Sequence, residues 1–173
     1  MKKVIEIFRT REELDKLANI PNPKYISGIR NRAILAVLCY AGLRVGELIN
    51  LKPSDIKEKD SAIKVNNAKW KSSRLVYVPN YLFHYIDKWK DIRPNSKYLF
   101  CSRYGKKLLP DYIQKMVKRS AKKIAPDKDI HPHCLPHIRN TILPPDKRHR
   151  NPSPHPGPLR HQHHYNLHHP GKH

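Results

Sequence analysis

Proline is so dense in the last quarter of this chain that regular helices and strands are not expected there. Nine of the 16 prolines and eleven of the 12 histidines lie in residues 131–173. Each proline lacks a backbone N–H and disfavours helix in the residue before it, and prolines occupy every second position from 152 to 158. We therefore expect a folded unit over residues 1–137 and a non-globular, disordered His/Pro-rich tail over residues 138–173.

The chain carries a large excess of positive charge. Lys and Arg number 35 against 14 Asp and Glu, a formal net charge of +21. This excess favours a polyanionic partner, nucleic acid before an anionic membrane. The longest nearly apolar run, residues 33–43, is about half of the ~20 residues that span a bilayer, and no signal peptide is visible. The three scattered cysteines form no CxxC pair, so we expect a reducing cytoplasm. With a nucleic-acid partner and no membrane partner, the expected location is cytoplasmic and nucleoid-associated.

Apolar residues recur at helical spacing through much of the first 130 residues. This spacing predicts helices over residues 10–19, 28–40, 45–51, 81–89 and 111–124. Thr10, with Glu13 three residues later, forms a capping box at the start of the first helix. Asp111 is expected to cap the last helix, which is basic and amphipathic.

Two short stretches alternate between apolar and polar residues, as strands with one buried face do. They cover residues 62–65 and 74–78 and flank a basic turn, so they predict an antiparallel hairpin. A further short strand is expected at residues 97–101. The predicted fold class is therefore α+β, a helix-rich body with a small antiparallel β-sheet.

Residues 30–56, RNRAILAVLCYAGLRVGELINLKPSDI, resemble the signature of the tyrosine recombinases, the phage integrase family. In that family a helix leads into a Gly-Leu-Arg turn, and a short helix bearing an acid follows. Residues 97–124 and the DIHPHCLPH after them resemble the approach to the family's second catalytic box. The resemblance implies a DNA breaking-rejoining catalytic core over residues 1–137, in truncated form, that cuts and rejoins DNA through a phosphotyrosine link. It also implies duplex DNA and other recombinase protomers as partners.

The resemblance assigns Arg44 as the first catalytic arginine and Glu47 as the acid that supports it. Cleavage of a phosphodiester builds charge on the non-bridging oxygens, so the site needs fixed cationic donors there. The planar fork of arginine can hold two oxygens and does not lose its proton. The alternative is a surface arginine with an acidic neighbour three residues on.

A lysine on a β-hairpin is the family's general acid, and Lys69 occupies the matching position. Lys71 is the alternative, because Ala68 and Trp70 replace the glycines that normally flank this lysine. The alternative interpretation is a solvated basic hairpin that contacts phosphates but supplies no general acid. The expected nucleic-acid contacts are Lys71, Arg74, Lys115, Lys118 and Arg119.

The second catalytic box departs from the family's His-x-Leu-Arg-His pattern. His133 and His137 match the two histidines, the first as a proton-transfer group and the second as a supporting residue, but Pro136 replaces the arginine. Losing such a donor costs on the order of a hundredfold to a thousandfold in rate. Tyr165 is the only tyrosine that follows, and it lacks the family's Leu-Gly-His element, so we do not expect it to be the nucleophile.

Two readings of the function follow from this departure. The chain is either a DNA-binding, site-specific recombinase domain with an incomplete catalytic site, or a non-enzymatic DNA-binding module, for example a competitor of a complete recombinase. Whether it is an enzyme therefore stays open. We hypothesise that the tail is a frame-shifted recombinase end, because residues 162–166 can be encoded so that the next frame reads Ser-Ile-Thr-Thr-Thr.

The histidines of residues 131–173 admit a metal-binding interpretation. His131, His133 and the cluster at residues 161–164 are imidazoles of the kind that bind zinc, nickel or copper. A structural zinc site usually has four ligands at compact spacing on a folded frame, and no CxxC element is present. We therefore predict no functional metal and no cofactor.

Overall fold

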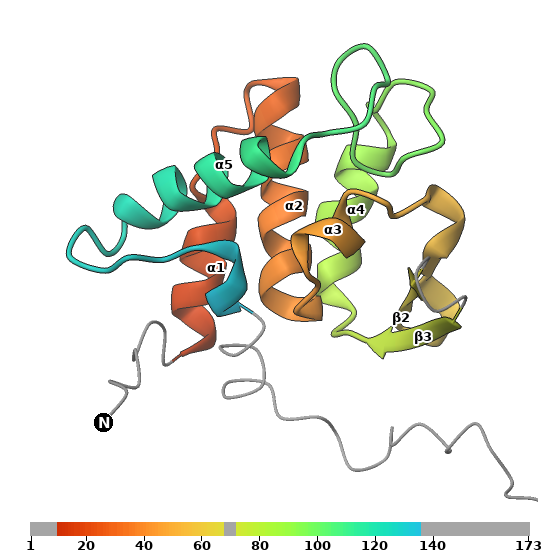
Figure 1. Cartoon of the computed structure of the whole chain (residues 1–173), viewed down its shortest axis with the longest axis horizontal. Helices are drawn as coiled ribbons and strands as arrows, with labels where there is room; N and C mark the ends of the chain where they lie inside the picture. The colour runs from red at the N-terminus through yellow and green to blue at the C-terminus, as the bar shows by residue number, and fades with distance from the viewer. Residues whose placement is uncertain (1–9, 68–71, 136–173) are drawn as a thin grey trace, which may run out of the picture.

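The computed structural model describes residues 10–67 and 72–135 (Figure 1). The main elements are α1 (Arg11–Asn19), α2 (Ile26–Ala41), α3 (Val45–Leu48), β1 (Ile56–Lys57), β2 (Ala62–Asn67), β3 (Ser72–Tyr77), α4 (Tyr81–Lys90) and α5 (Pro110–Lys122). Three single 3-10 turns, η1 (Pro53–Asp55), η2 (Glu58–Asp60) and η3 (Pro132–Cys134), complete the order. The predicted α+β class, helix-rich with a small antiparallel sheet, is confirmed.

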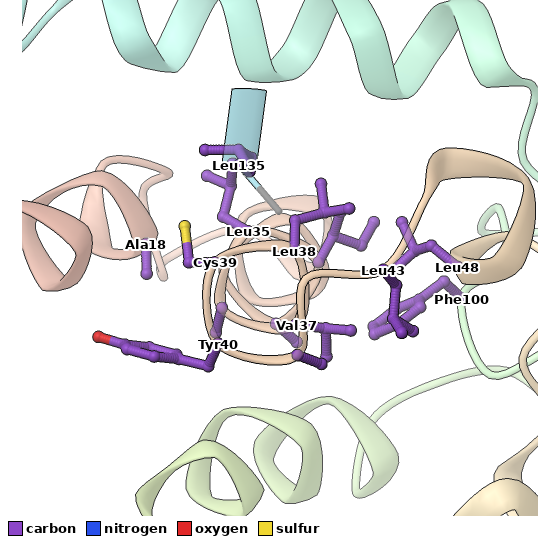
Figure 2. Packing of buried hydrophobic residues seen from close by; sticks show 14 of the residues in the cluster. Ala18, Leu35, Val37, Leu38, Cys39, Tyr40, Leu43, Leu48, Phe100 and Leu135 are labelled. Carbon is purple, nitrogen blue, oxygen red and sulfur yellow. The ribbon is translucent and has the colours of Figure 1, made fainter. Parts of the chain in front are cut away.

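Helix α2 lies at the centre of the molecule, between α1 and α4 (Figure 1). Every side chain from Ala33 to Tyr40 is fully buried, so the second half of this helix is apolar all round rather than on one face. Figure 2 shows its side chains pointing outward in several directions into the core. None of the helices in residues 10–67 and 72–135 is both long and apolar enough to cross a membrane.

The ends of the first two helices follow from local sequence. Thr10 and Glu13 form the predicted capping box: Glu13 N–H donates to Thr10 Oγ1 at 3.3 Å, and Thr10 N–H donates to Glu13 Oε2 at 3.2 Å. Helix α2 ends at Gly42, whose φ of 62° is in the left-handed region that glycine adopts readily. This turn ends the helix two residues before Arg44.

The sheet has the order β1-β2-β3, with both pairs antiparallel. The predicted hairpin is confirmed, and Val65 pairs with Arg74 in its register. Strand β1 was not predicted, because two residues are too few to show an alternating pattern. The strand predicted at residues 97–101 is wrong. That segment is held by Leu99 N–H donating to Leu51 O at 2.6 Å and by one isolated bridge, Cys101 to Lys107.

The basic helix α5 begins differently from the prediction. Its N-cap is Leu109, and Pro110 occupies the first turn, where its missing N–H and fixed φ cost nothing. The predicted cap, Asp111, instead lies inside the helix and pairs with Lys115 at 2.8 Å. The buried face of α5 comprises Ile113, Met116, Val117, Ser120 and Ala121. The predicted helix at residues 45–51 is shorter, a single turn.

Candidate functional site

An open cleft of about 1140 Å³ lies among α3, the hairpin, the segment at residues 97–98, α5 and η3. Its polar lining includes Arg44, Glu47, Asn50, Lys52, Asp55, Lys64, Asn66, Lys97, Gln114 and His133. The cleft brings together three residues that the sequence singled out, Arg44, Glu47 and His133. The remaining polar residues in the cleft were not predicted as site residues.

Arg44 reaches the cleft because its two neighbours in the chain are anchored in the core. Leu43 is fully buried and Val45 is 7% exposed, whereas Arg44 is exposed. The backbone of Arg44 is held in place by two hydrogen bonds. Its N–H donates to Glu47 Oε2 at 2.9 Å, and its carbonyl accepts from Leu48 N–H at 2.9 Å. Within residues 10–67 and 72–135, no group accepts a hydrogen bond from its guanidinium.

Glu47 binds the backbone N–H of Arg44 and, in addition, the side chain of a second arginine that the sequence did not suggest. Arg74, on β3, donates from both terminal nitrogens to the Glu47 carboxylate, at 2.8 and 3.1 Å. Burial raises the pKa of Glu47, but the hydrogen bonds from Arg74 and from Arg44 N–H, together with smaller contributions from the positive charges of Arg74 and Arg44, outweigh it and lower the pKa overall. Glu47 therefore supports Arg44 through the backbone, and its charge is balanced by Arg74.

Asp55 is a second carboxylate of the cleft, and it was not among the predicted site residues. It is 6% exposed, and it accepts hydrogen bonds from Lys52 N–H at 2.9 Å and from the Asn66 side-chain amide at 3.0 Å. The spacing Lys52-Pro53-Ser54-Asp55, with proline at the first position of a turn, was a usable signal. Both carboxylates in the cleft are thus satisfied within the protein.

His133 lies on η3 and lines the cleft. It is exposed, whereas its neighbours Pro132, Cys134 and Leu135 are buried, so the turn presents this histidine outward. The turn is closed by Cys134 N–H donating to the carbonyl of His131 at 3.0 Å. The ring centroids of His131 and His133 are 5.8 Å apart.

The predicted nucleic-acid contacts that fall within the described residues, Arg74, Lys115, Lys118 and Arg119, do not line the cleft. Lys115 pairs with Asp111, and Lys118 pairs with Asp129 at 3.2 Å. Arg119 is exposed on the same helix and has no ion-pair partner in residues 10–67 and 72–135. The side chain that α5 contributes to the cleft is Gln114.

Five sequence positions that matter to the prediction lie outside the described residues: Lys69, Lys71, Pro136, His137 and Tyr165. The tail predicted at residues 138–173 also lies outside them. Among the residues that are described, no group of three or more His, Cys, Asp or Glu side chains is arranged to hold a metal ion.

Residues 8–144 match the phage integrase family, and the chain belongs to that family. It is 31% identical over 144 residues to a tyrosine recombinase of Thermosipho africanus, covering 83% of this chain and 50% of that protein. The chain thus spans about half the length of the curated relatives that it matches.

Solved structures support the same assignment. The crystal structure of XerA recombinase is 31% identical, with a TM-score of 0.66 over 76% of this chain and 48% of that one. The XerH site-specific recombinase, in a post-cleavage complex with a palindromic difH substrate, has a TM-score of 0.64 at 23% identity, covering 78% of this chain and 41% of that one. The fold is therefore that of a tyrosine recombinase catalytic domain.

Proposed function

We propose that this chain is a DNA-binding, site-specific recombinase or integrase-type domain whose cleft receives a phosphate of the DNA backbone. The observation that carries the proposal is that Arg44 and His133, from distant parts of the sequence, line one cleft. These are the two residues that the family pattern assigns to phosphate binding and to proton transfer. Duplex DNA is the proposed partner, and the proposed location is the nucleoid.

The electrostatics of the cleft support a polyanionic ligand. Its two carboxylates, Glu47 and Asp55, are already engaged by Arg74 and by Asn66 with a backbone N–H. The cations Arg44, Lys52, Lys64 and Lys97 line the same cleft. Because the two carboxylates are already engaged, they are not available to these cations. A phosphate backbone that enters the cleft would therefore bind the cations and release counterions.

The proposed chemistry assigns one role to each residue. The guanidinium of Arg44 holds two non-bridging oxygens while a tyrosine oxygen attacks phosphorus and the bond to the 5′ oxygen breaks. His133 assists proton transfer, with His137 in support. Lys69, with Lys71 as the alternative, gives the departing 5′ oxygen its proton. The other cations, Arg119 and the lysines of α5, contact neighbouring phosphates.

We also propose that the covalent step is not completed by this chain. Pro136 has neither charge nor donor at the position of the second arginine, and Tyr165 lacks the element that precedes the family's nucleophile. This observation favours the second candidate function, a DNA-binding module that acts with, or competes against, complete recombinase protomers. The two candidates share the DNA-binding step and differ in whether a phosphotyrosyl bond forms.

Binding of a fluorescent DNA duplex, followed by anisotropy over a series of salt concentrations, tests the shared step. We expect the affinity to fall steeply as salt rises, because each lysine–phosphate or arginine–phosphate contact releases counterions. An affinity that stays constant between low and moderate salt would contradict the proposed DNA-binding function.

A further inference from the structure

The cleft that is proposed to bind phosphate contains a carboxylate close to its principal arginine. Glu47 follows Arg44 by three residues and lines the same cleft, with its side chain only 15% exposed. An unbalanced carboxylate there would repel a phosphate. It would also attract the Arg44 guanidinium, since residues three apart on a helical turn are neighbours. Phosphate binding therefore requires that the charge of Glu47 be balanced by another group.

Arg74 supplies that balance. Both of its terminal nitrogens donate to Glu47, one to each oxygen, in the paired geometry that makes arginine–carboxylate contacts strong. Arg74 does not line the cleft, although its side chain is 45% exposed. Its donors are thus committed to a carboxylate, whereas those of Arg44 are bound by no group in residues 10–67 and 72–135.

We propose that Arg74 is a positioning residue: it neutralises Glu47 and so leaves the Arg44 guanidinium available to a DNA phosphate. This inference rests on the proposed function. It replaces the expectation that Arg74 itself contacts DNA. The lowered pKa of Glu47 is consistent with it, because a carboxylate that stays ionised at neutral pH needs a counter-charge in an anion-binding cleft.

A double-mutant cycle on DNA affinity tests the proposal. Arg74→Ala should weaken duplex binding by about tenfold, because the freed Glu47 carboxylate competes with phosphate for Arg44. Adding Glu47→Gln to Arg74→Ala should restore the affinity to within about threefold of the unaltered chain. If Arg74 contacted DNA directly, the loss would persist in the Glu47→Gln background. A persistent loss, or no loss on Arg74→Ala, would overturn the proposal.

A spectroscopic signature separates positioning from a general loss of structure. The Nε–Hε resonance of Arg44, followed by NMR, should shift in Arg74→Ala and return toward its original position in the double variant. Arg74→Met provides a second variant that keeps the aliphatic packing of the side chain, and it should show the same loss and the same rescue. An unchanged Arg44 resonance in both Arg74 variants would contradict the proposal.

Failure of this inference can be told apart from failure of the proposed function. If Arg44→Ala weakens DNA binding while the Arg74→Ala loss is not reversed by Glu47→Gln, only the role of Arg74 is wrong. If Arg44→Ala leaves binding unchanged, the phosphate site itself is wrong, and the role of Arg74 is wrong with it.

Discussion

Gly28, in the first turns of α2, faces the carbonyl oxygen of Asn22 so closely that a β-carbon on it would lie 1.7 Å from that oxygen. No real contact of this kind is that short, so the backbone of residues 22–28 can close only around a glycine. The loop between α1 and α2 is thereby fixed against the start of the central helix.

Gly28→Ala should therefore destabilise the fold, although alanine is the better helix former. The clash is expected to cost about 1–3 kcal/mol or more, which exceeds the ~1 kcal/mol that alanine gains in a helix. Gly46→Ala in α3 is the matched control, since nothing lies within 4 Å of the added carbon. Urea unfolding should show a loss for the first variant and none for the second. Equal stabilities would contradict the close approach at Gly28.

The buried thiols of Cys39 and Cys101 should not react with alkylating reagents in the folded protein. Cys39 and Cys101 are fully buried, and burial, with a smaller contribution from Asp15, raises the pKa of Cys39 to about 12. Because the thiolate is the reactive form, alkylation at pH 8 should modify neither cysteine until denaturant is added. Mass spectrometry of peptides after treatment with iodoacetamide measures this. Rapid native labelling of Cys39 would mean that α2 is not the central, buried helix.

The Glu47–Arg74 pair predicts a pH dependence of stability. Since the pKa of Glu47 is lowered in the folded protein, the pair stabilises the fold above the ordinary pKa of a glutamate, and that contribution is lost as pH falls through the lowered pKa of the folded state. Glu47→Gln should therefore unfold at lower urea concentration than the unaltered chain at pH 7, and the difference should shrink near pH 3. A difference of equal size at both pH values would contradict the lowered pKa.

The fold was predictable where its determinants are local. Helices α1, α2 and α4 and the β2–β3 hairpin follow from periodicity and from the capping box at Thr10. The start of α5 was not predictable, because Pro110 and Asp111 are both residues that favour the start of a helix. Two such signals at adjacent positions leave the first residue of the helix ambiguous. The apolar run at residues 99–101 suggested a strand, but it is buried as a connecting segment with a single bridge to Lys107.

In the candidate site, only residues that belong to a recognisable local sequence motif were predictable. Arg44 sits in a Gly-Leu-Arg turn, and His133 sits in a recognisable box. The partner of Glu47 is 27 positions away on β3, so no local spacing could reveal it. Lys64 and Lys97 belong to a strand and a connecting segment, where a lysine looks like any solvated charge until the fold places it in the cleft.

The chain as it stands should not form a covalent link to DNA. Pro136 stands at the position of the second arginine, and Tyr165 lacks the element that precedes the family's nucleophile. Catalytic groups that act on one transition state are strongly non-additive, so the remaining residues should not supply a proportional share of the rate. Incubation with nicked suicide DNA should give no adduct, and Pro136→Arg alone should not produce one. An adduct that Tyr165→Phe abolishes would make Tyr165 the nucleophile and the chain an enzyme.

The central claim, that the Arg44–His133 cleft binds a DNA phosphate, is tested most directly by comparing two variants that each lose one positive charge. Lys90, on α4, pairs with Asp87 at 3.3 Å and does not line the cleft, so Lys90→Ala is the control. In equilibrium duplex binding at one salt concentration, Arg44→Ala should weaken affinity by about tenfold to a hundredfold, and Lys90→Ala by less than about twofold. Equal effects of the two substitutions would contradict the claim and leave Arg44 a surface charge.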